Sequence, residues 1–284
     1  RSVLSHVLLP EGFALNLGLK EYKNRRYLAE ALIGRRGEAD EQIVPGPRTY
    51  DGAYTELTLT WHGVKVRVQT AAFGSQREQM VMLVTPEHDE RMIPLLVVES
   101  AMLWGRPGTI RRSGNRLIGM LPSRVVEVYG TWRNIRDPYI AVKTLHLAMP
   151  LDRTVGISTG QRRSLAEICE ILERSKAEHK VHMQAFDDLT EVYAAVQTCM
   201  AWDTVYDPEK DRVISPVSRN WSVNWGGYVL FDWDTYFAAY LAGIDNRDLA
   251  YANAVEITHE RTERGFVPNF ATVRDIKSRD RSQP

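Results

Sequence analysis

The chain has 284 residues and a mass of 32.4 kDa, a length that favours two domains. Its 36 basic residues balance 36 acidic ones, and its hydrophobic content of 44% is enough for a full core. A neutral chain without interleaved aromatic and basic residues excludes a general attraction to nucleic acid or an anionic membrane. The longest apolar run, residues 92–104, contains Pro94 and Glu99 and is shorter than the roughly 20 residues that span a bilayer, so we expect no membrane helix.

The cysteines and histidines are sparse. Two cysteines are too few for a disulfide framework or a four-thiolate zinc site, and we expect Cys169 and Cys199 to be buried in helices. This fits a reducing compartment and favours the cytoplasm over secretion. His179 and His182 lie three residues apart without a third ligand nearby, and no glycine-rich nucleotide motif occurs, so the sequence predicts neither a metal nor a cofactor.

The first half of the chain carries strand patterns. Residues 1–48 are mixed, with a short helical stretch that closes at Arg35–Gly37 and an extended turn at Pro45–Pro47. From Tyr54 apolar and polar residues alternate on both sides of the Trp61–Gly63 turn, which predicts a hairpin. Further strand candidates separated by turn residues are 80–84, 94–98, 109–112, 116–120, 124–129 and 140–148. Short strands at this spacing predict a β-sandwich domain over residues 1–160.

Helical spacing replaces the strand pattern near Ser164. Ser164 and Glu167 fit a capping box, and apolar residues then recur at helical intervals to about residue 200. A second helical run begins near Asp234, and a third extends from Asn246 to Gly265. The predicted fold class is therefore multidomain, β then α. The predicted divisions are a sandwich at 1–160, a helical linker at 161–199 and a second domain at 200–284.

A dense aromatic and acidic cluster marks the start of the second helical run. Asp232 and Asp234 flank Trp233, and four aromatic residues lie within seven positions. Aromatic faces stack on the C–H face of a pyranose, and carboxylates accept hydrogen bonds from sugar hydroxyls. The alternative is structural: one of the two aspartates caps the helix and the aromatic residues belong to the core.

A second polar cluster follows the last predicted helix. Asn269 comes after Gly265-Phe266-Val267-Pro268, and the stretch Arg279–Pro284 contains Arg281 and Gln283. Amide groups both donate and accept, which suits pairs of neighbouring hydroxyls, and a guanidinium can orient a substrate oxygen. The alternative is a basic loop in contact with solvent.

Three blocks, in this order, carry a family resemblance: Trp233–Phe237, Gly265–Asn269 and Arg281–Pro284. Together they resemble the trehalases of glycoside hydrolase family 37. With Gly226–Asp234 included, the chain is still more similar to the α-glucosidase-type enzymes of glycoside hydrolase family 63. The similarity covers about residues 200–284, and residues 1–160 more loosely resemble the β-sandwich that precedes the barrel in family 63 enzymes.

The resemblance implies the N-terminal part of such an enzyme: a β-sandwich followed by the beginning of an (α/α)6 barrel. It implies inverting hydrolysis of an α-glycosidic bond, most simply an α-glucosidic bond, in a small glucoside or oligosaccharide. It places Trp233 and Asp234 in the sugar pocket, with Asn269, Arg281 and Gln283 completing the ring of polar contacts. In these families the acid and the base follow the third block, so we expect both catalytic carboxylates beyond Pro284 and assign neither.

The length of the helical part leads to a further expectation. A barrel of about twelve helices needs well over 200 residues, whereas only about 120 follow residue 163. The sequence begins at Arg1 and stops within the third block. We therefore expect this chain to be a piece of the enzyme, whose C-terminal remainder is a second chain or a missing segment.

Two other functions stay open at this point. The chain could be a non-catalytic carbohydrate-binding module that uses a concave aromatic strip on the sandwich formed by Trp61, Trp104 and Trp132. It could also be a different six-hairpin-barrel enzyme, such as a phosphorylase, rhamnosidase or lyase, since a fold does not decide a reaction. Arg279 and Arg281 would then supply the anion site of a phosphorylase. Under every one of these hypotheses the expected partner is a carbohydrate.

Overall fold

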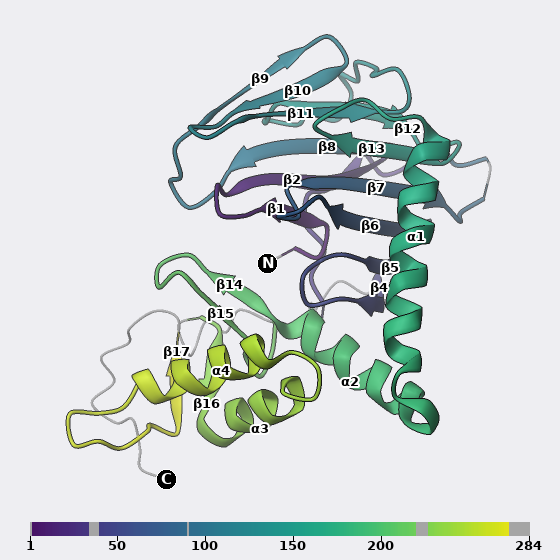
Figure 1. Cartoon of the computed structure of the whole chain (residues 1–284). Helices are drawn as coiled ribbons and strands as arrows, with labels where there is room; N and C mark the ends of the chain where they lie inside the picture. Colours follow the sequence, from purple (N-terminus) through teal and green to yellow (C-terminus); the bar gives the residue numbers. More distant parts are fainter. Residues whose placement is uncertain (1, 34–39, 90, 220–226, 273–284) are drawn as a thin grey trace. The chain divides into compact units, whose positions relative to one another are not determined.

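The computed structural model describes residues 2–33, 40–89, 91–219 and 227–272 (Figure 1). These residues form two compact units, one of Ser2–Ala185 and one that begins at Phe186. The stretch 161–199, expected to be a linker, is divided between the two units. None of the helices in the described ranges is both long and apolar enough to cross a lipid bilayer.

The first unit contains two antiparallel sheets. The five-stranded sheet has the order β1-β2-β8-β12, with β3 paired to β2. Its strands are β1 (Ser5–Leu8), β2 (Phe13–Glu21), β3 (Arg26–Leu28), β8 (Leu95–Met102) and β12 (His146–Pro150). The eight-stranded sheet has the order β4-β5-β6-β7-β13-β11-β10-β9. Its strands are β4 (Glu41–Arg48), β5 (Thr55–Trp61), β6 (Val64–Phe73), β7 (Gln79–Pro86), β9 (Thr109–Ser113), β10 (Arg116–Met120), β11 (Val125–Gly130) and β13 (Val155–Thr159).

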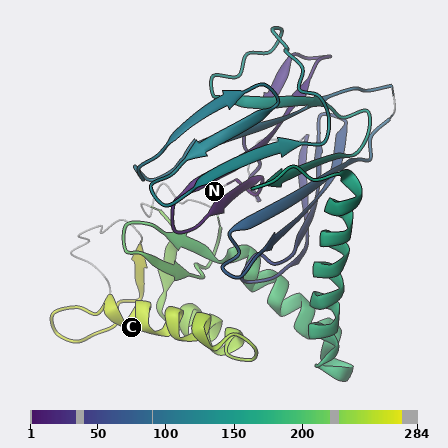
Figure 2. The ribbon, with the colours of Figure 1, turned by 45° about the horizontal axis from the view of Figure 1, so that its top comes forward.

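The two sheets pack face to face, as Figure 2 shows. Two glycines lie at close contacts between the sheets. A Cβ atom on Gly119 of β10 would lie 2.5 Å from Cε2 of Phe13 in β2, and one on Gly130 of β11 would lie 2.4 Å from Sδ of Met149 in β12. A side chain at either glycine would therefore meet the opposite sheet, which identifies these faces as the interior of a sandwich.

Helix α1 (Leu165–Gln184) covers the outer face of the eight-stranded sheet. It begins with the predicted capping box, in which the Ser164 hydroxyl accepts from the Glu167 amide and the Glu167 carboxylate accepts from the Ser164 amide. Ile168 and Leu172 pack against Ala71, Val81 and Leu83 of the sheet. Helix α1 therefore belongs to the sandwich unit.

The second unit is mainly helical. Its elements are η1 (Asp187–Leu189), α2 (Thr190–Asp203), β14 (Val205–Asp207), β15 (Arg212–Ile214), β16 (Val229–Phe231), α3 (Asp232–Ala242), α4 (Arg247–His259) and β17 (Phe270–Thr272). Helices α3 and α4 pack side by side across a short connection, and the Tyr236 hydroxyl lies 3.1 Å from the Thr258 hydroxyl. Buried Ile214, Leu230, Ile257 and Ala271 form the core that supports this helical hairpin.

The predicted order of β then α is confirmed: a β-sandwich comes first, and a mainly helical unit with one helical hairpin follows. That this unit begins an (α/α)6 barrel stays a prediction. The hairpin around Trp61–Gly63 is also confirmed, as β5 and β6. The mixed N-terminal region instead contains β1–β3. Arg35–Gly37 lie outside the described residues, and no helix precedes them in residues 29–33.

Three smaller predictions are wrong. The strand expected at 140–148 begins only at His146, and α4 ends at His259 rather than at Gly265. After Ile257 no apolar residue continues the buried face of that helix before Phe266, so nothing holds further turns against the core. Neither cysteine is buried: Cys169 is half-buried and packs against the core, and Cys199 is exposed.

Candidate functional site

Trp233 and Asp234 lie in the first turn of α3. Phe231 precedes the helix in an extended conformation and provides no side-chain cap. Neither aspartate is therefore the N-cap residue of the structural alternative, although carboxylates in a first turn are favoured by the positive end of the helix dipole. The Trp233 side chain is 68% exposed and Asp234 is also exposed, so this pair does not belong to the core of the unit.

Asn269 lies beside this first turn. Strands β16 and β17 form a two-stranded ribbon in which Phe231 is paired with Phe270. One residue further along, the Asp232 amide donates to the Asn269 carbonyl at 3.0 Å. The ribbon therefore brings together the first two sequence blocks, which are 28 positions apart in the chain, from Phe237 to Gly265.

The sequence of the second block explains this placement. Gly265 has a φ of +86°, a conformation that favours glycine, and its amide donates to the Thr262 carbonyl at 2.8 Å. The Thr262 amide in turn donates to the Phe266 carbonyl at 2.7 Å, which closes the turn. Val267 packs against the core and Pro268 is buried. The turn reverses the chain so that β17 can run back along β16.

A polar network holds the helices behind the ribbon. The Asn253 amide group is fully buried; it accepts from the Ser215 amide at 2.8 Å and donates to the Leu249 carbonyl at 3.1 Å. The side chain of Arg212, 4% exposed, contacts carboxylates of Asp207, Glu256 and Glu260. Burial by itself would lower the pKa of Arg212, but its hydrogen bonds to the carboxylates of Glu256 and Asp207 more than offset burial and raise the pKa. This network fixes α4, and with it the position of α3.

The remaining predicted site residues are Arg281 and Gln283, and both lie outside the described residues. So do the Asn220–Gly226 stretch and the two residues Arg279 and Asp280. Of the five predicted sugar-binding residues, the structure thus places Trp233, Asp234 and Asn269, and it brings these three to one end of α3.

Asp203 is a carboxylate that the sequence did not single out. It is the last residue of α2, and burial raises the pKa of its carboxyl above the ordinary range, partly offset by Arg219. A raised pKa is a property of general acids, but it also occurs in structural carboxyls. The sequence holds no pattern around Asp203 that could have revealed it, because its burial comes from the folded unit and its partner Arg219 is sixteen residues away.

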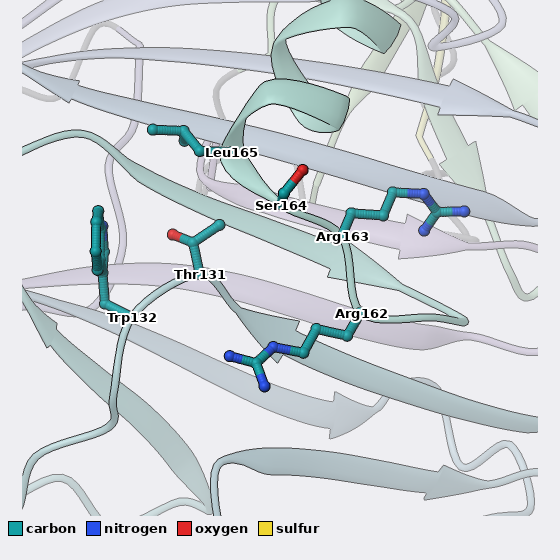
Figure 3. A pocket seen from close by; sticks show the side chains of 6 residues that line it. All are labelled: Thr131, Trp132, Arg162, Arg163, Ser164 and Leu165. Carbon is teal, nitrogen blue, oxygen red and sulfur yellow. The ribbon is translucent and has the colours of Figure 1, made fainter.

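The sandwich has its own candidate surface. Of the three tryptophans expected to form a strip, Trp61 is buried, whereas Trp104 and Trp132 are 41% and 38% exposed. Trp132 also lines a hollow of about 440 Å³ in which the other residues are Thr131, Arg162, Arg163, Ser164 and Leu165 (Figure 3). A three-tryptophan strip therefore does not form, and Trp132 combines exposure with a concave surface.

Within the described ranges, no group of three or more His, Cys, Asp or Glu side chains could hold a metal ion. His179 is half-buried and stacks on Tyr54 with 6.4 Å between ring centroids, so this histidine packs against the sandwich instead of lying on the outer surface of α1.

Comparisons with known proteins give structural matches only. No protein-family model matches the chain, and no curated protein sequence matches it at a significant level. A bacterial glucoamylase solved in complex with acarbose is similar with a TM-score of 0.45 and 11% identity, over 96% of this chain and 49% of that one. A putative kojibiose phosphorylase from the human microbiome gives a TM-score of 0.40 and 10% identity, over 90% of this chain and 41% of that one.

This chain therefore spans about half the length, or less, of these two solved proteins. At such low similarity neither match assigns an activity. The function must be argued from the residues of this chain.

Proposed function

We propose that this chain is part of an inverting glycoside hydrolase that cleaves α-glycosidic, most specifically α-glucosidic, bonds in a small glucoside or oligosaccharide. The observation that carries the proposal is the ribbon of β16 and β17, which brings Asn269 to the first turn of α3 beside Trp233 and Asp234. These are two of the three blocks on which the resemblance to family 63 enzymes rests.

The chemistry of the three described residues suits a sugar ring. The exposed Trp233 indole offers a flat apolar surface for the C–H face of a pyranose. The Asp234 carboxylate accepts hydrogen bonds from hydroxyls, and the Asn269 amide can both donate and accept. We assign Arg281 and Gln283 to the same set of polar contacts around the sugar because they match the third block of the family pattern.

The two carboxyl groups of an inverting enzyme, about 6.5–9.5 Å apart, are assigned to polypeptide outside this chain. The described part of the second unit contains three α-helices, α2, α3 and α4, far fewer than an (α/α)6 barrel needs. An intact-mass measurement of the protein purified from its natural source tests this assignment. A larger polypeptide or a second tightly bound fragment is expected, and an active species of 32.4 kDa would contradict it.

Activity is tested on that complete protein with a panel of aryl α- and β-glycosides in phosphate-free buffer. We expect release of free glucose from an α-glucoside, with the β-anomer formed first because the configuration is inverted. Asp234→Asn and Trp233→Ala should each lower kcat/KM by about 10–100-fold, the loss expected for a charged hydrogen bond or a stacking surface. Trp104→Ala removes an exposed tryptophan of the sandwich and should leave kcat/KM unchanged.

Three outcomes would contradict the proposal. They are a preference for β-glycosides, an absolute requirement for inorganic phosphate, and unchanged kinetics in both Trp233→Ala and Asp234→Asn.

A further inference from the structure

The hollow beside Trp132 lies entirely within the sandwich unit. It forms where the chain leaves β11 and where α1 begins, and its volume of about 440 Å³ falls in the range of small-molecule sites (Figure 3). None of its lining residues belongs to the cluster around Trp233.

One wall of the hollow is a fixed aromatic plane. The Trp132 indole N–H donates to the Thr154 carbonyl at 2.8 Å, and the Arg153 guanidinium lies 5.2 Å from the ring centroid. These contacts hold the ring in one orientation while 38% of the residue stays exposed. Figure 3 shows the ring edge-on, so that its flat face is turned across the hollow toward Thr131 and Arg162. Because the ring is already fixed, stacking a sugar on this face would cost the Trp132 side chain little entropy.

The polar groups of the hollow include one uncommitted cation. Arg162 is exposed and makes no hydrogen bond or ion pair with another residue in the described part of the chain, so its five N–H donors are available. The neighbouring Arg163 is committed, because it donates to the Thr159 carbonyl at 2.9 Å and to the Gln79 side chain at 2.7 Å. The Thr131 hydroxyl accepts from the Gly156 amide at 3.0 Å and keeps its own hydrogen for a ligand.

The start of α1 itself offers no anion site, and an anionic ligand in the hollow would have Arg162 as its available cation. The Glu167 carboxylate already accepts from the Ser164 amide and hydroxyl, both at 2.7 Å. The positive end of the helix is thus compensated from within the chain, and a further anion beside Ser164 would be repelled by Glu167. A neutral polyol meets no such repulsion and can accept from Arg162.

We propose that this hollow is a second carbohydrate site, in which Trp132 stacks on one residue of a neutral oligosaccharide and Arg162 donates to its hydroxyls. The site holds sugar without cleaving it. It does not depend on the proposed hydrolase activity, although it would supply such an enzyme with a place to retain an oligosaccharide.

The test is calorimetric titration of this chain with maltotetraose and cellotetraose as neutral probes and tetragalacturonate as the anionic probe. We expect a neutral probe to bind, and Trp132→Ala to raise its Kd about tenfold, the equivalent of about 1.4 kcal/mol from an aromatic contact. Arg162→Met should raise Kd severalfold without affecting folding, since Arg162 is exposed. Trp132→Phe keeps an aromatic plane and should retain part of the affinity. Trp104→Ala is the matched control, because Trp104 is exposed on the same unit but outside the hollow.

The proposal is overturned if neither neutral probe binds, if tetragalacturonate binds more tightly than both, or if Trp104→Ala weakens binding as much as Trp132→Ala. Should Trp132→Ala fail to fold, Arg162→Met decides, since unchanged affinity in that variant contradicts the site. Trp233→Ala should keep the calorimetric binding, and Trp132→Ala should keep hydrolysis of a small aryl glycoside by the complete protein. These two results show whether the hollow beside Trp132 or the proposed hydrolase site at Trp233 is the one that fails.

Discussion

The two units of the molecule bury their apolar surface in different ways. In the sandwich the inner faces of both sheets meet, and α1 covers part of an outer face, so that Phe13, Leu59 and Ile168 are inaccessible to solvent. In the helical unit the core is small, and a stripe along α3 stays in contact with solvent. Trp233, Phe237 and Tyr240, at helical spacing, are 68%, 65% and 79% exposed. The sandwich has covered its core with its own residues, whereas α3 keeps an apolar face available to a ligand or to further helices.

The largest expected effect comes from the charge network of the helical unit. Arg212→Met should lower the free energy of unfolding of that unit by about 3–5 kcal/mol, because it leaves the buried Asp207 carboxylate without its cation. Urea unfolding followed by far-UV circular dichroism measures the loss. Arg91→Met is the control: its side chain is 93% exposed and pairs only with Asp89, so its removal should have almost no effect. Equal losses in the two variants would show that Arg212 is not structural.

A smaller loss is expected at the contact between the two sheets. Gly119→Ala places a Cβ atom 2.5 Å from the Phe13 ring, and relief of this overlap should cost about 1–3 kcal/mol of sandwich stability. Thermal unfolding of Gly119→Ala, Phe13→Leu and the double variant measures the coupling. Because Phe13→Leu makes room for the new methyl group, the double variant should lose less than the sum of the single variants. If the stability losses of the two single variants add up exactly in the double variant, the two residues are not in contact.

The pH dependence of sandwich stability should change at His179. Burial, with a smaller contribution from His182, lowers the pKa of His179 in the folded state below its ordinary value of 6.5. The unfolded chain therefore binds the proton first as pH falls, and stability declines below about pH 6.5. His179→Gln should flatten this decline in melts recorded between about pH 5 and pH 7.5. His259→Gln, at an exposed position of the helical unit, is the control. If stability falls with pH as steeply in His179→Gln as in the unchanged protein, His179 does not contribute to the acid sensitivity.

The smallest effect is expected on the exposed stripe. Phe237→Ser should change the stability of this chain by no more than about 0.5 kcal/mol, since the side chain is 65% exposed. Ile257→Ala, in the core of the same unit, should cost about 2–5 kcal/mol. In a complete barrel that covers α3, Phe237→Ser should instead become destabilising. A large loss in this chain alone would show that the stripe is already part of a core.

The sequence predicted elements well where local patterns are strong. Strict alternation of apolar and polar residues predicted the hairpin of β5 and β6, and the pair of Ser164 and Glu167 predicted the start of α1. Strand β2 was missed even though Phe13, Leu15, Leu17 and Leu19 alternate with the other residues of the strand. Lys20 is fully buried against Asp137 at 2.7 Å, and no local rule predicts a partner 117 residues away.

The candidate site was predictable only in part for the same reason. The residue types around Trp233 indicated sugar chemistry, and the family resemblance grouped the blocks. Neither could show that Asn269 reaches α3 through a ribbon of two three-residue strands. Gly265 was expected to end a helix and instead forms the turn before that ribbon, because the apolar face of α4 ends at Ile257.

The ribbon of β16 and β17 divides the second unit into a part that tolerates length changes and a part that does not. A register slip of one position between these strands would break the hydrogen bond from the Asp232 amide to the Asn269 carbonyl, and with it the placement of Asn269 at the start of α3. Insertions in the connection between α3 and α4 would leave the pairing of Phe231 with Phe270 intact. A single added residue between Val229 and Asp234, or between Val267 and Thr272, would not. Length changes in this unit should therefore be placed in the α3–α4 connection, with both strands kept at their present length.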